Sequence, residues 1–485
     1  MAVAAGQART DGDTVGALVE FALGHTTPRA GSALLDTLVD TVAVTMGGLD
    51  TEPVRALRSW IEPSIGQTPV WGTAERLAPS RAALVNGTAA HALDYDDAGL
   101  TMPVHPSAVL WPAVLALSTR QTSTARVLAA VETGHILIRA LADVLPMKEH
   151  YGRGWHATST VGVLAATAAG AALVGLTAAQ ARHAVGIAAS TAAGGLSNFG
   201  TMTKPFHAGR AASDAVMAVG LAGVGFTANP DELDDPHGFL ARYGDPSAVA
   251  EQQVDLTDRI SYWTEHWAED CAIKQFAACF GTHRALAAAV RLREALPDLS
   301  QVRSIEVEAH PATLRPLRPG LPRTGNEATF SMAFNVAQAL RTGGVGPGDF
   351  TPETITANAD LMALVTTTPA EAPSVPEGVG PAGPAEPVEA VEAVEAVDLG
   401  GRRFAQVTVR LADGSGLTEL VTLDTAADRP APAAIDDKLV RCLSAVGVTA
   451  ETAEALPARL RAAALDPTVE ALITLLSEHL IEEES

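Results

Sequence analysis

From residue 14 to residue 272 the sequence repeats one kind of segment, an Ala-, Leu- and Val-rich stretch with helical spacing and helix-end residues on its flanks. Hydrophobic residues make up 47% of the chain and aromatic residues only 4%. Because Ala is the best helix former and a weak strand former, this core composition favours close-packed helices. We therefore predict a large all-helical domain over 14–272. Its expected helices are 14–23, 28–46, 52–65, 80–93, 107–117, 123–145, 161–176, 177–193 and 208–224.

Helix-end signals support two of these segments. Thr27 is placed as an N-cap with Pro28 at the first helical position, and Gly47-Gly48 provides a stop. Thr177 is placed as the N-cap of another helix. No strand alternates with these helices, so a βαβ architecture is not expected.

The pattern changes after residue 273, where a smaller α+β domain is predicted over 273–425. Residues 302–310 alternate with period two, as a strand does. Two β runs within 404–421 flank an Asp-Gly pair, which is a strong hairpin signal. Helices are expected at 282–296 and 331–340.

Three further segments complete the predicted organisation. Residues 1–13 have the composition of a disordered tail, and 368–399 that of a flexible, Pro-rich acidic insertion. Residues 426–485 return to helices, which we expect to pack back onto the helical domain. The fold class is therefore mainly α, with a large helical domain and a smaller α+β domain.

Charge and cysteine content exclude several classes of function. The net charge of −23 repels nucleic acid and anionic membranes. Three cysteines without a CxxC pair are typical of reduced thiols, and residues 1–13 lack the features of a signal peptide. The most apolar stretch, 161–176, is rich in Ala, Gly and Thr, so we expect a buried helix rather than a membrane span. A cytoplasmic protein is predicted.

A cluster of cations interrupts the Ala-rich sequence at residues 200–212. It contains Lys204, His207 and Arg210. Lysine is rarely buried without a partner, since desolvating its charge costs several kcal/mol or more. The segment therefore indicates an anion-holding site, although Lys204 could equally be a surface lysine with a buried stem.

Two other helix junctions carry polar residues. Asp94 lies at the end of one helix, in the segment that leads to a loop containing His105. Prolines on both sides of Val104-His105 fix a non-helical turn in that loop. His156 lies in a Gly-rich junction before an apolar helix, close to Arg153. Three polar junctions at helix ends suggest one shared site, while the acids around Asp94 could also be solvated residues at a helix end.

The sequence lacks HExxH, paired cysteines, an EF-hand loop, a P-loop and GxSxG, so no metal or nucleotide cofactor is expected. A site of His, Lys and Asp suits proton transfer beside a carboxylate. Removing a proton α to a carboxylate builds a dianion that needs fixed positive charge, and His is a good acid or base near neutral pH.

Six stretches match, in order, motifs of a known family: HALDYDD, PVHPS, YGRGWHATS, GTMTKPFHAGRAA, GVGFT and IKQFAACFGTH. On these motifs the chain resembles the MmgE/PrpD family over roughly residues 14–345. The family includes dehydratases, decarboxylases and epimerases of small carboxylic acids.

The resemblance implies a metal-free, usually dimeric enzyme with its active site between a helical domain and an α+β lid. It assigns catalytic roles to Asp94, His105, His156 and Lys204. Substrate-binding roles are expected for a second set: Lys274, His283, Arg153, His207, Arg210 and Phe334.

Three departures from the family pattern bear on the reaction. Ala98 stands where decarboxylase-like members carry Thr, and Phe334 stands where they carry an active-site Tyr. The loop to His105 is also one residue longer. Loss of both hydroxyls argues against the decarboxylation performed by those members. The insertion at 368–399 also lies outside the pattern.

We therefore predict a metal-free lyase, of dehydratase or decarboxylase type, that acts on a small polycarboxylate. His105 and His156 are expected to exchange protons with the substrate, Lys204 to anchor a carboxylate or act as an acid, and Asp94 to orient or balance a histidine. The alternatives are an epimerase, isomerase or cyclase that uses the same proton abstraction, and a non-catalytic carboxylate-binding homologue.

Overall fold

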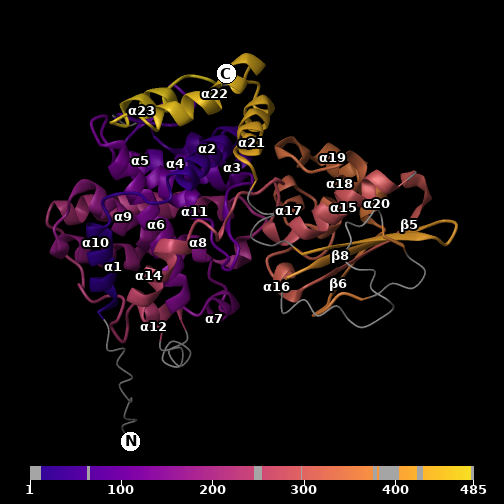
Figure 1. The fold of residues 1–485 in the computed structure, drawn as a ribbon, viewed down its shortest axis with the longest axis horizontal. Helices are drawn as coiled ribbons and strands as arrows, with labels where there is room; N and C mark the ends of the chain where they lie inside the picture. Colours follow the sequence, from indigo (N-terminus) through magenta and orange to yellow (C-terminus); the bar gives the residue numbers. More distant parts are fainter. Residues whose placement is uncertain are drawn as a thin grey trace, which may run out of the picture.

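A computed structural model describes residues 13–62, 66–244, 254–296, 298–374, 380–381, 403–422 and 430–481. These residues form a helical body and a smaller body built on a mixed sheet, which confirms the predicted mainly-α class (Figure 1). We call them the helical body and the sheet body. The predicted tail at 1–13, apart from Asp13, and most of the predicted insertion at 368–399 lie outside the described residues.

The helical body is formed by the chain up to residue 272 together with the C-terminal helices. Its first helices are α1 (Thr14–Gly24), α2 (Gly31–Gly48), α3 (Glu52–Trp60), α4 (Pro79–Ala92), α5 (Ser107–Leu117), α6 (Thr124–Val144) and α7 (Met147–Gly152). They are followed by α8 (Ala157–Thr160), α9 (Gly162–Val174), α10 (Ala178–Thr191), η1 (Leu196–Asn198), α11 (Thr203–Gly223), α12 (Phe239–Tyr243) and α14 (Leu256–His266). Two short ladders accompany them: β1 (Thr68–Pro69) with β2 (Arg76–Leu77), and β3 (Ala98–Gly99) with β4 (Cys271–Ala272).

Two predicted helix starts are wrong, and tertiary contacts give a reason in one case. Helix α2 begins at Gly31 rather than at Pro28, because the backbone N–H groups of Arg29 and Ala30 donate to the Glu132 carboxylate of α6. Helix α11 begins at Thr203 rather than at 208. Pro205 fits there, since the first turn of a helix needs no N–H from it. By contrast, the Thr177 cap of α10 is confirmed as a capping box with Gln180.

The centre of the helical body is α9, which packs against α5, α6, α10 and α11. The segment Ala157–Val174 is long and apolar enough to cross a bilayer, but 89% of it is buried within the protein. Among the described residues, the bent pair of α2 and α3 passes the same test only when the two helices are taken together. The expectation of a buried helix around 161–176 agrees with this core position.

Helices α4 and α11 approach each other closely through small residues. A Cβ atom on Gly87 would lie 2.8 Å from the Cα atom of Gly209, which is shorter than real Cβ contacts. One on Gly209 would overlap the Leu84 carbonyl and the Thr88 side chain. This close crossing brings the end of α4 next to the first turn of α11, where Lys204 lies.

The sheet body contains five strands in the order β6-β5-β8-β9-β7. Its strands are β5 (Val302–Ala309), β6 (Val365–Pro369), β7 (Gly380–Pro381), β8 (Ala405–Leu411) and β9 (Gly416–Val421). Its helices are η2 (Phe280–Thr282), α15 (His283–Ala295), η3 (Leu299–Gln301), α16 (Pro311–Leu314), α17 (Gly325–Ala328), α18 (Met332–Thr342), η4 (Pro347–Asp349), α19 (Pro352–Ala357) and α20 (Ala359–Met362). The predicted strand and the β8–β9 hairpin are confirmed. Helix α15 packs on β8 and β9, and α18 packs on β6.

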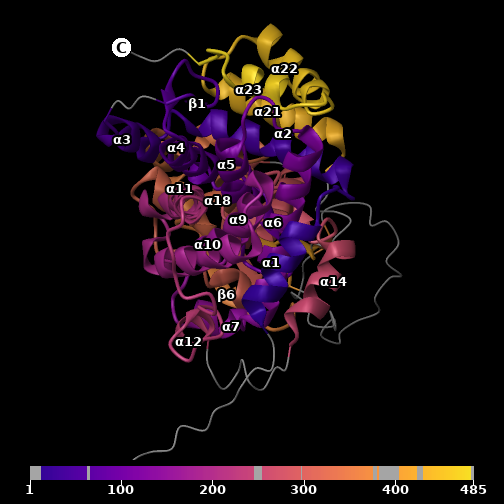
Figure 2. The same ribbon diagram turned by 90° about the vertical axis from the view of Figure 1, so that its left-hand side faces the viewer.

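The C-terminal helices are α21 (Pro432–Ala445), α22 (Ala450–Ala463) and α23 (Glu470–Leu476). They lie over α2 at the top of the helical body in both views (Figures 1 and 2). Their apolar residues belong to the same core as those of α1 to α14, whereas the sheet body has a core of its own. The chain thus leaves the helical body, forms the sheet body and returns.

Candidate active site

The centre of the site is the turn that follows α4. Asp94 there has φ of 46°, the one positive value among the described non-glycine residues. Asp tolerates this left-handed conformation better than most residues, yet it remains strained, and such strain is common at functional sites. The turn places the Asp94 carboxylate against two lysines from distant parts of the chain.

Asp94 bridges Lys204 of α11 and Lys274, which follows β4. Its Oδ1 atom lies 3.1 Å from the Lys204 Nζ and 2.7 Å from the Lys274 Nζ. Lys274 also donates to the Asp94 carbonyl oxygen at 2.7 Å. All three side chains are almost fully buried. The anion site predicted from residues 200–212 therefore already contains one carboxylate shared by two ammonium groups.

His91, in the last turn of α4, connects this ion cluster to Asp96. Its Nδ1 atom lies 2.8 Å from Asp96 Oδ2, and its Nε2 atom lies 3.0 Å from the Lys204 Nζ. Since the ammonium group can only donate, Nε2 accepts and Nδ1 carries the ring proton. Sequence reasoning missed this residue. The signal was available, because His91 stands in the same HALDYDD motif, three residues before Asp94.

His105 lies beside His91, with their ring centroids 4.6 Å apart. Its Nδ1 atom lies 3.0 Å from the Asp97 carbonyl oxygen and 3.4 Å from Asp96 Oδ2. A carbonyl only accepts, so Nδ1 carries the ring proton and Nε2 keeps its lone pair. The backbone N–H of His105 donates to Thr158 at 3.1 Å, which fixes the Pro-flanked loop against α8. His105 therefore presents one unprotonated ring nitrogen.

His156, at the start of α8, completes the group of histidines. Its ring stacks on that of His91 with centroids 5.7 Å apart, and its Nδ1 atom lies 3.2 Å from Nδ1 of His207. Its Nε2 atom is buried and has no hydrogen-bond partner within the described part of the chain. Buried polar atoms are rarely left unpaired, so this nitrogen is a natural contact for a substrate oxygen.

Burial sets the protonation of the site. It lowers the pKa of His91 to about 4, although Asp96 opposes the shift. It also lowers the pKa values of His105 and His156, so all three imidazoles are neutral near pH 7. Burial alone would raise the pKa of Asp94, but Lys204 and Lys274 hold it well below its usual range. The site thus combines neutral bases with an ionised carboxylate.

Four of these side chains also have the composition of a metal site. The ligand atoms of His91, Asp94, Asp96 and His105 all lie within 4.8 Å of one another. However, Lys204 and Lys274 already contact Asp94, and Lys204 contacts the second nitrogen of His91. A divalent ion bound through Asp94 would share this carboxylate with two ammonium groups, whose positive charge repels it.

Aromatic residues from both bodies surround Lys204. Its Nζ atom lies 5.3 Å from the ring centroid of Phe199 and 5.2 Å from that of Phe330. Together with Cys279, these two residues form a small apolar cluster where the two bodies meet. Cations are attracted to the faces of aromatic rings, so this pair stabilises the buried ammonium group.

A cavity of about 470 Å³ lies beside this aromatic pair, between Gly200-Thr201 of the helical body and a segment of the sheet body that includes Arg318 and Ser331. Arg318 donates to the carbonyl oxygens of Phe199 and Ser197, at 2.5 and 2.7 Å. The cavity therefore adjoins the Lys204 end of the site, and one arginine both lines it and links the two bodies.

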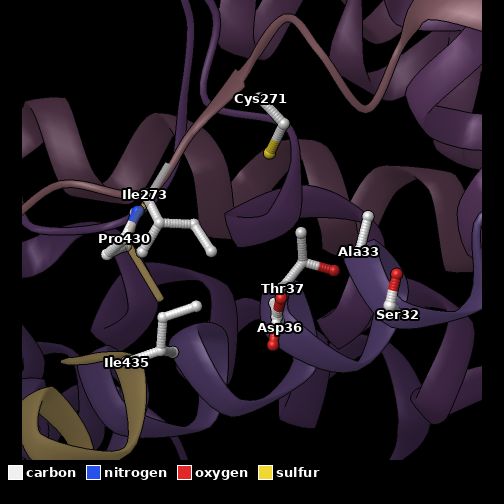
Figure 3. Close-up of a pocket in the computed structure, with 8 residues that line it drawn as sticks. All are labelled: Ser32, Ala33, Asp36, Thr37, Cys271, Ile273, Pro430 and Ile435. Carbon is white, nitrogen blue, oxygen red and sulfur yellow. The ribbon is translucent and has the colours of Figure 1, made fainter. Parts of the chain in front are cut away.

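A second cavity, of about 120 Å³, lies on another side of the site and contains none of the predicted site residues (Figure 3). Its walls come from α2, the β4 segment, helix α21 and Pro430, which lies just before that helix. The lining residues are Ser32, Ala33, Asp36, Thr37, Cys271, Ile273, Pro430 and Ile435.

The structure brings most, but not all, of the predicted site residues together. Asp94, His105, His156 and Lys204 converge, and Lys274 and His207 join them. His283 lies nearby: its Nε2 donates to the Ala278 carbonyl at 3.1 Å, and burial, together with Lys274, lowers its pKa to about 3. Asp94 pairs with lysines rather than with a histidine, and Asp96 takes the histidine contacts.

Three predicted substrate-binding residues lie elsewhere. Arg153 is exposed and donates to the Gly244 carbonyl. Arg210 is half exposed and pairs with Asp214 on its own helix. Phe334 is fully buried in the core of the sheet body, with its ring 5.5 Å from that of Phe350. Phe330, four residues earlier, is the aromatic residue of the sheet body that contacts Lys204.

Comparison with known proteins identifies the family of the chain. The model of the MmgE/PrpD N-terminal domain matches residues 17–252, and that of the MmgE/PrpD C-terminal domain matches residues 276–422. The chain is similar to cis-aconitate decarboxylase of Homo sapiens, with 32% identity over 56% of this chain and 57% of the relative. It is similar to cis-aconitate decarboxylase of Aspergillus terreus at 28%, over 54% and 56%. The match thus spans somewhat more than half the length of these relatives. With two family domains covering most of its length, the chain belongs to the MmgE/PrpD family.

Proposed function

We propose that this protein is a metal-free lyase that acts on a small polycarboxylate by His and Lys acid–base catalysis. One observation carries the proposal: a buried carboxylate, Asp94, is shared by the ammonium groups of Lys204 and Lys274 beside three neutral imidazoles. Such a site combines positive charge for an anionic intermediate with bases that can remove a proton.

The lysine pair supplies the anion-binding half of the proposed site. Lys204 uses two donors on His91 and Asp94, and Lys274 uses two on Asp94. Each ammonium group has three donors, so each retains one for a substrate carboxylate. The pair also carries one more positive charge than Asp94 neutralises. A substrate carboxylate placed there would become more negative as the α proton leaves, and the two lysines would stabilise that change.

The histidines supply the proton-transfer half. His105 is the proposed general base, because its Nδ1 proton is held by the Asp97 carbonyl and its Nε2 lone pair remains available. His156 is proposed to contact the substrate as the second proton-exchanging group, because its unpaired Nε2 would gain a hydrogen bond with a bound ligand. His91 would fix the positions of the Lys204 and Asp96 side chains, and it would not contact the reacting carbon.

The names of the relatives bear on the type of lyase. Those cited above are decarboxylases, which supports a lyase of decarboxylase or dehydratase type. Ala98, which replaces a hydroxyl-bearing residue of decarboxylase-like members, is buried and pairs with Ala272 in the β3–β4 ladder. The site therefore lacks a hydroxyl at this position, which favours a substrate or reaction different from that of the relatives.

Proton NMR in D2O tests the proposal with 2-methylcitrate, cis-aconitate, citrate and iminodisuccinate as probes. We expect elimination or CO2 loss with at least one acid, accompanied by solvent exchange of the α proton. His105→Ala and Lys204→Ala should each lower turnover by about a hundredfold or more, as expected for acid–base and charge-stabilising groups. His237→Ala and Lys148→Ala, at exposed positions, are the matched controls and should retain full turnover.

The outcomes separate the alternatives. Exchange without an elimination product would replace the lyase by an isomerase that uses the same bases. Tight binding without exchange would indicate a non-catalytic homologue. Full turnover in folded His105→Ala and Lys204→Ala variants would refute the assigned residues. Activity that disappears with a chelator and returns with a divalent ion would refute the metal-free mechanism.

A further inference from the structure

Helix α21 inserts a fully buried lysine, Lys438, behind the candidate active site. Its Nζ atom donates to the carbonyl oxygen of Tyr95 at 2.6 Å and to that of Lys274 at 3.0 Å. It also lies 2.5 Å from Asp40 Oδ1 of α2 and 3.8 Å from the ring centroid of Tyr95. One ammonium group therefore touches three segments that are far apart in the sequence.

Two of these contacts are to the backbone that carries the site. Tyr95 lies between Asp94 and Asp96, and Lys274 is the residue whose side chain pairs with Asp94. Lys438 thus fixes the main chain on both sides of the Asp94–Lys274 ion pair. Lys438 contacts neither carboxylate of the turn. It also touches no side chain that is proposed to bind substrate, because its contact with Lys274 is to the main chain.

We propose that Lys438 is a positioning residue that holds the Asp94 turn and Lys274 in their reactive arrangement. The inference rests on the proposed function for its catalytic consequence. The strained φ of Asp94 persists only where the surroundings hold it in place, and the bond from Lys438 to the next carbonyl does this.

Tyr95 is held at its other end as well. Its hydroxyl group donates to the Gln275 carbonyl at 3.0 Å, and Arg441, one turn after Lys438 in α21, donates to the same hydroxyl at 3.3 Å. Helix α21 therefore links the Asp94 turn to residues 274–275 through two side chains. Residues 274–275 belong to the segment in which the chain passes from the helical body to the sheet body, so α21 contacts this connection directly.

Packing alone secures this segment incompletely. The side chains of Cys271 and Ile273 face the cavity of about 120 Å³ in Figure 3, together with Ile435 of α21. Space on that side leaves the main chain around Lys274 dependent on its polar contacts, namely the β3–β4 ladder, the bond from the Tyr95 hydroxyl to the Gln275 carbonyl, and the Lys438 bond. A polar contact at this position accordingly has more influence on geometry than it would within a filled core.

Asp40 gives the main alternative explanation, in which Lys438 only balances a buried charge. Burial raises the pKa of Asp40 to about 7, with Lys438 opposing the shift. The ion pair and the carbonyl contacts can be separated by substitution. Asp40→Asn removes the ion pair and keeps the lysine on both carbonyls. Asp40→Asn/Lys438→Met removes both without leaving an unpaired carboxylate, so it avoids the folding penalty of Lys438→Met alone.

The test compares these two variants with the wild type by steady-state kinetics and hydrogen exchange. For Asp40→Asn/Lys438→Met we expect kcat to fall at least tenfold while KM changes less than threefold, because proton transfer needs closer geometry than carboxylate binding. Amides in peptides covering 92–97 and 271–275 should exchange at least tenfold faster, whereas those of α9 should not change. Asp40→Asn leaves the Lys438 ammonium without its buried counter-charge, so it should lower global stability, but it should keep the wild-type kcat and the slow exchange of these peptides relative to α9.

Two results would overturn the inference. In the first, the double variant keeps both kcat and the slow exchange. In the second, Asp40→Asn loses as much as the double variant, which would assign the effect to the ion pair. If instead the wild type processes none of the probe acids while the exchange pattern appears as expected, the positioning inference stands and the proposed function fails.

Discussion

The coupling energy between Asp94 and Lys274 should be far larger than that of an exposed pair of equal length. The two atoms lie 2.7 Å apart and both side chains are buried. At an effective dielectric constant of about 20, attraction at this distance is about 6 kcal/mol before desolvation is subtracted. Removing one partner of a buried pair typically costs about 3–5 kcal/mol. Because Lys204 stays beside Asp94, we expect a coupling energy of about 2–4 kcal/mol.

A double-mutant cycle measures this coupling. Asp94→Asn, Lys274→Met and their combination are unfolded with urea at pH 7, and the m values are compared because a change in m would signal altered cooperativity. Arg341 and Asp360 provide the control cycle, since they are also 2.7 Å apart but the carboxylate is 71% exposed. Exposed pairs contribute less than about 1 kcal/mol. Additivity of the buried pair within about 0.5 kcal/mol would refute the reasoning.

The same pair predicts a pH dependence. The pKa of Asp94 is held below its unfolded value of about 3.9, so its stabilisation is complete above that pH and is lost as the pH falls through the lower folded value. The pKa of Lys274 is raised, chiefly by Asp94 against the effect of burial, so its stabilisation is lost only above about pH 10. The penalty of Asp94→Asn should therefore be constant from about pH 5 to 9 and shrink below pH 4.

Two further predictions concern α4 and α11. Gly209→Ala should destabilise the protein by about 2 kcal/mol or more in thermal unfolding, because the new Cβ would overlap α4. In the same helix, a Cβ at Gly220 meets no atom within 4 Å, so Gly220→Ala should be neutral or stabilise by up to about 1 kcal/mol. Equal effects of the two substitutions would contradict the close crossing. His91→Gln should lower kcat by about tenfold or more with a preserved fold by circular dichroism, because Lys204 and Asp96 lose their common partner, and unchanged kcat would show that Lys204 is held by Asp94 alone.

Local sequence signals were sufficient for much of the fold. Helix α10 was predictable because Thr177 caps it within a few residues, and the β8–β9 hairpin because an Asp-Gly turn joins neighbouring strands. Local signals failed to give the start of α2. The Glu132 carboxylate, which is distant in sequence, accepts hydrogen bonds from the backbone N–H groups of Arg29 and Ala30, and the helix therefore begins after these residues. Caps and turns act over a few residues, whereas such tertiary contacts leave no periodic pattern.

The sequence by itself determined that polar residues gather at three helix junctions and that His105, His156, Lys204 and Asp94 belong together. Only the tertiary structure decided how they pair. Lys274 reaches Asp94 across 180 positions, and Lys438 reaches the Tyr95 carbonyl across 343.

Side-chain direction was equally a tertiary matter. Lys204 and Arg210 share the first two turns of α11, yet one is buried against Asp94 and the other is half exposed. Phe330 rather than Phe334 meets the lysine, because the second ring is taken up by the core of the sheet body. Residue type fixes what chemistry a side chain can perform, but the packing of helices fixes which charges it meets and whether water is excluded, and these set its pKa and its role.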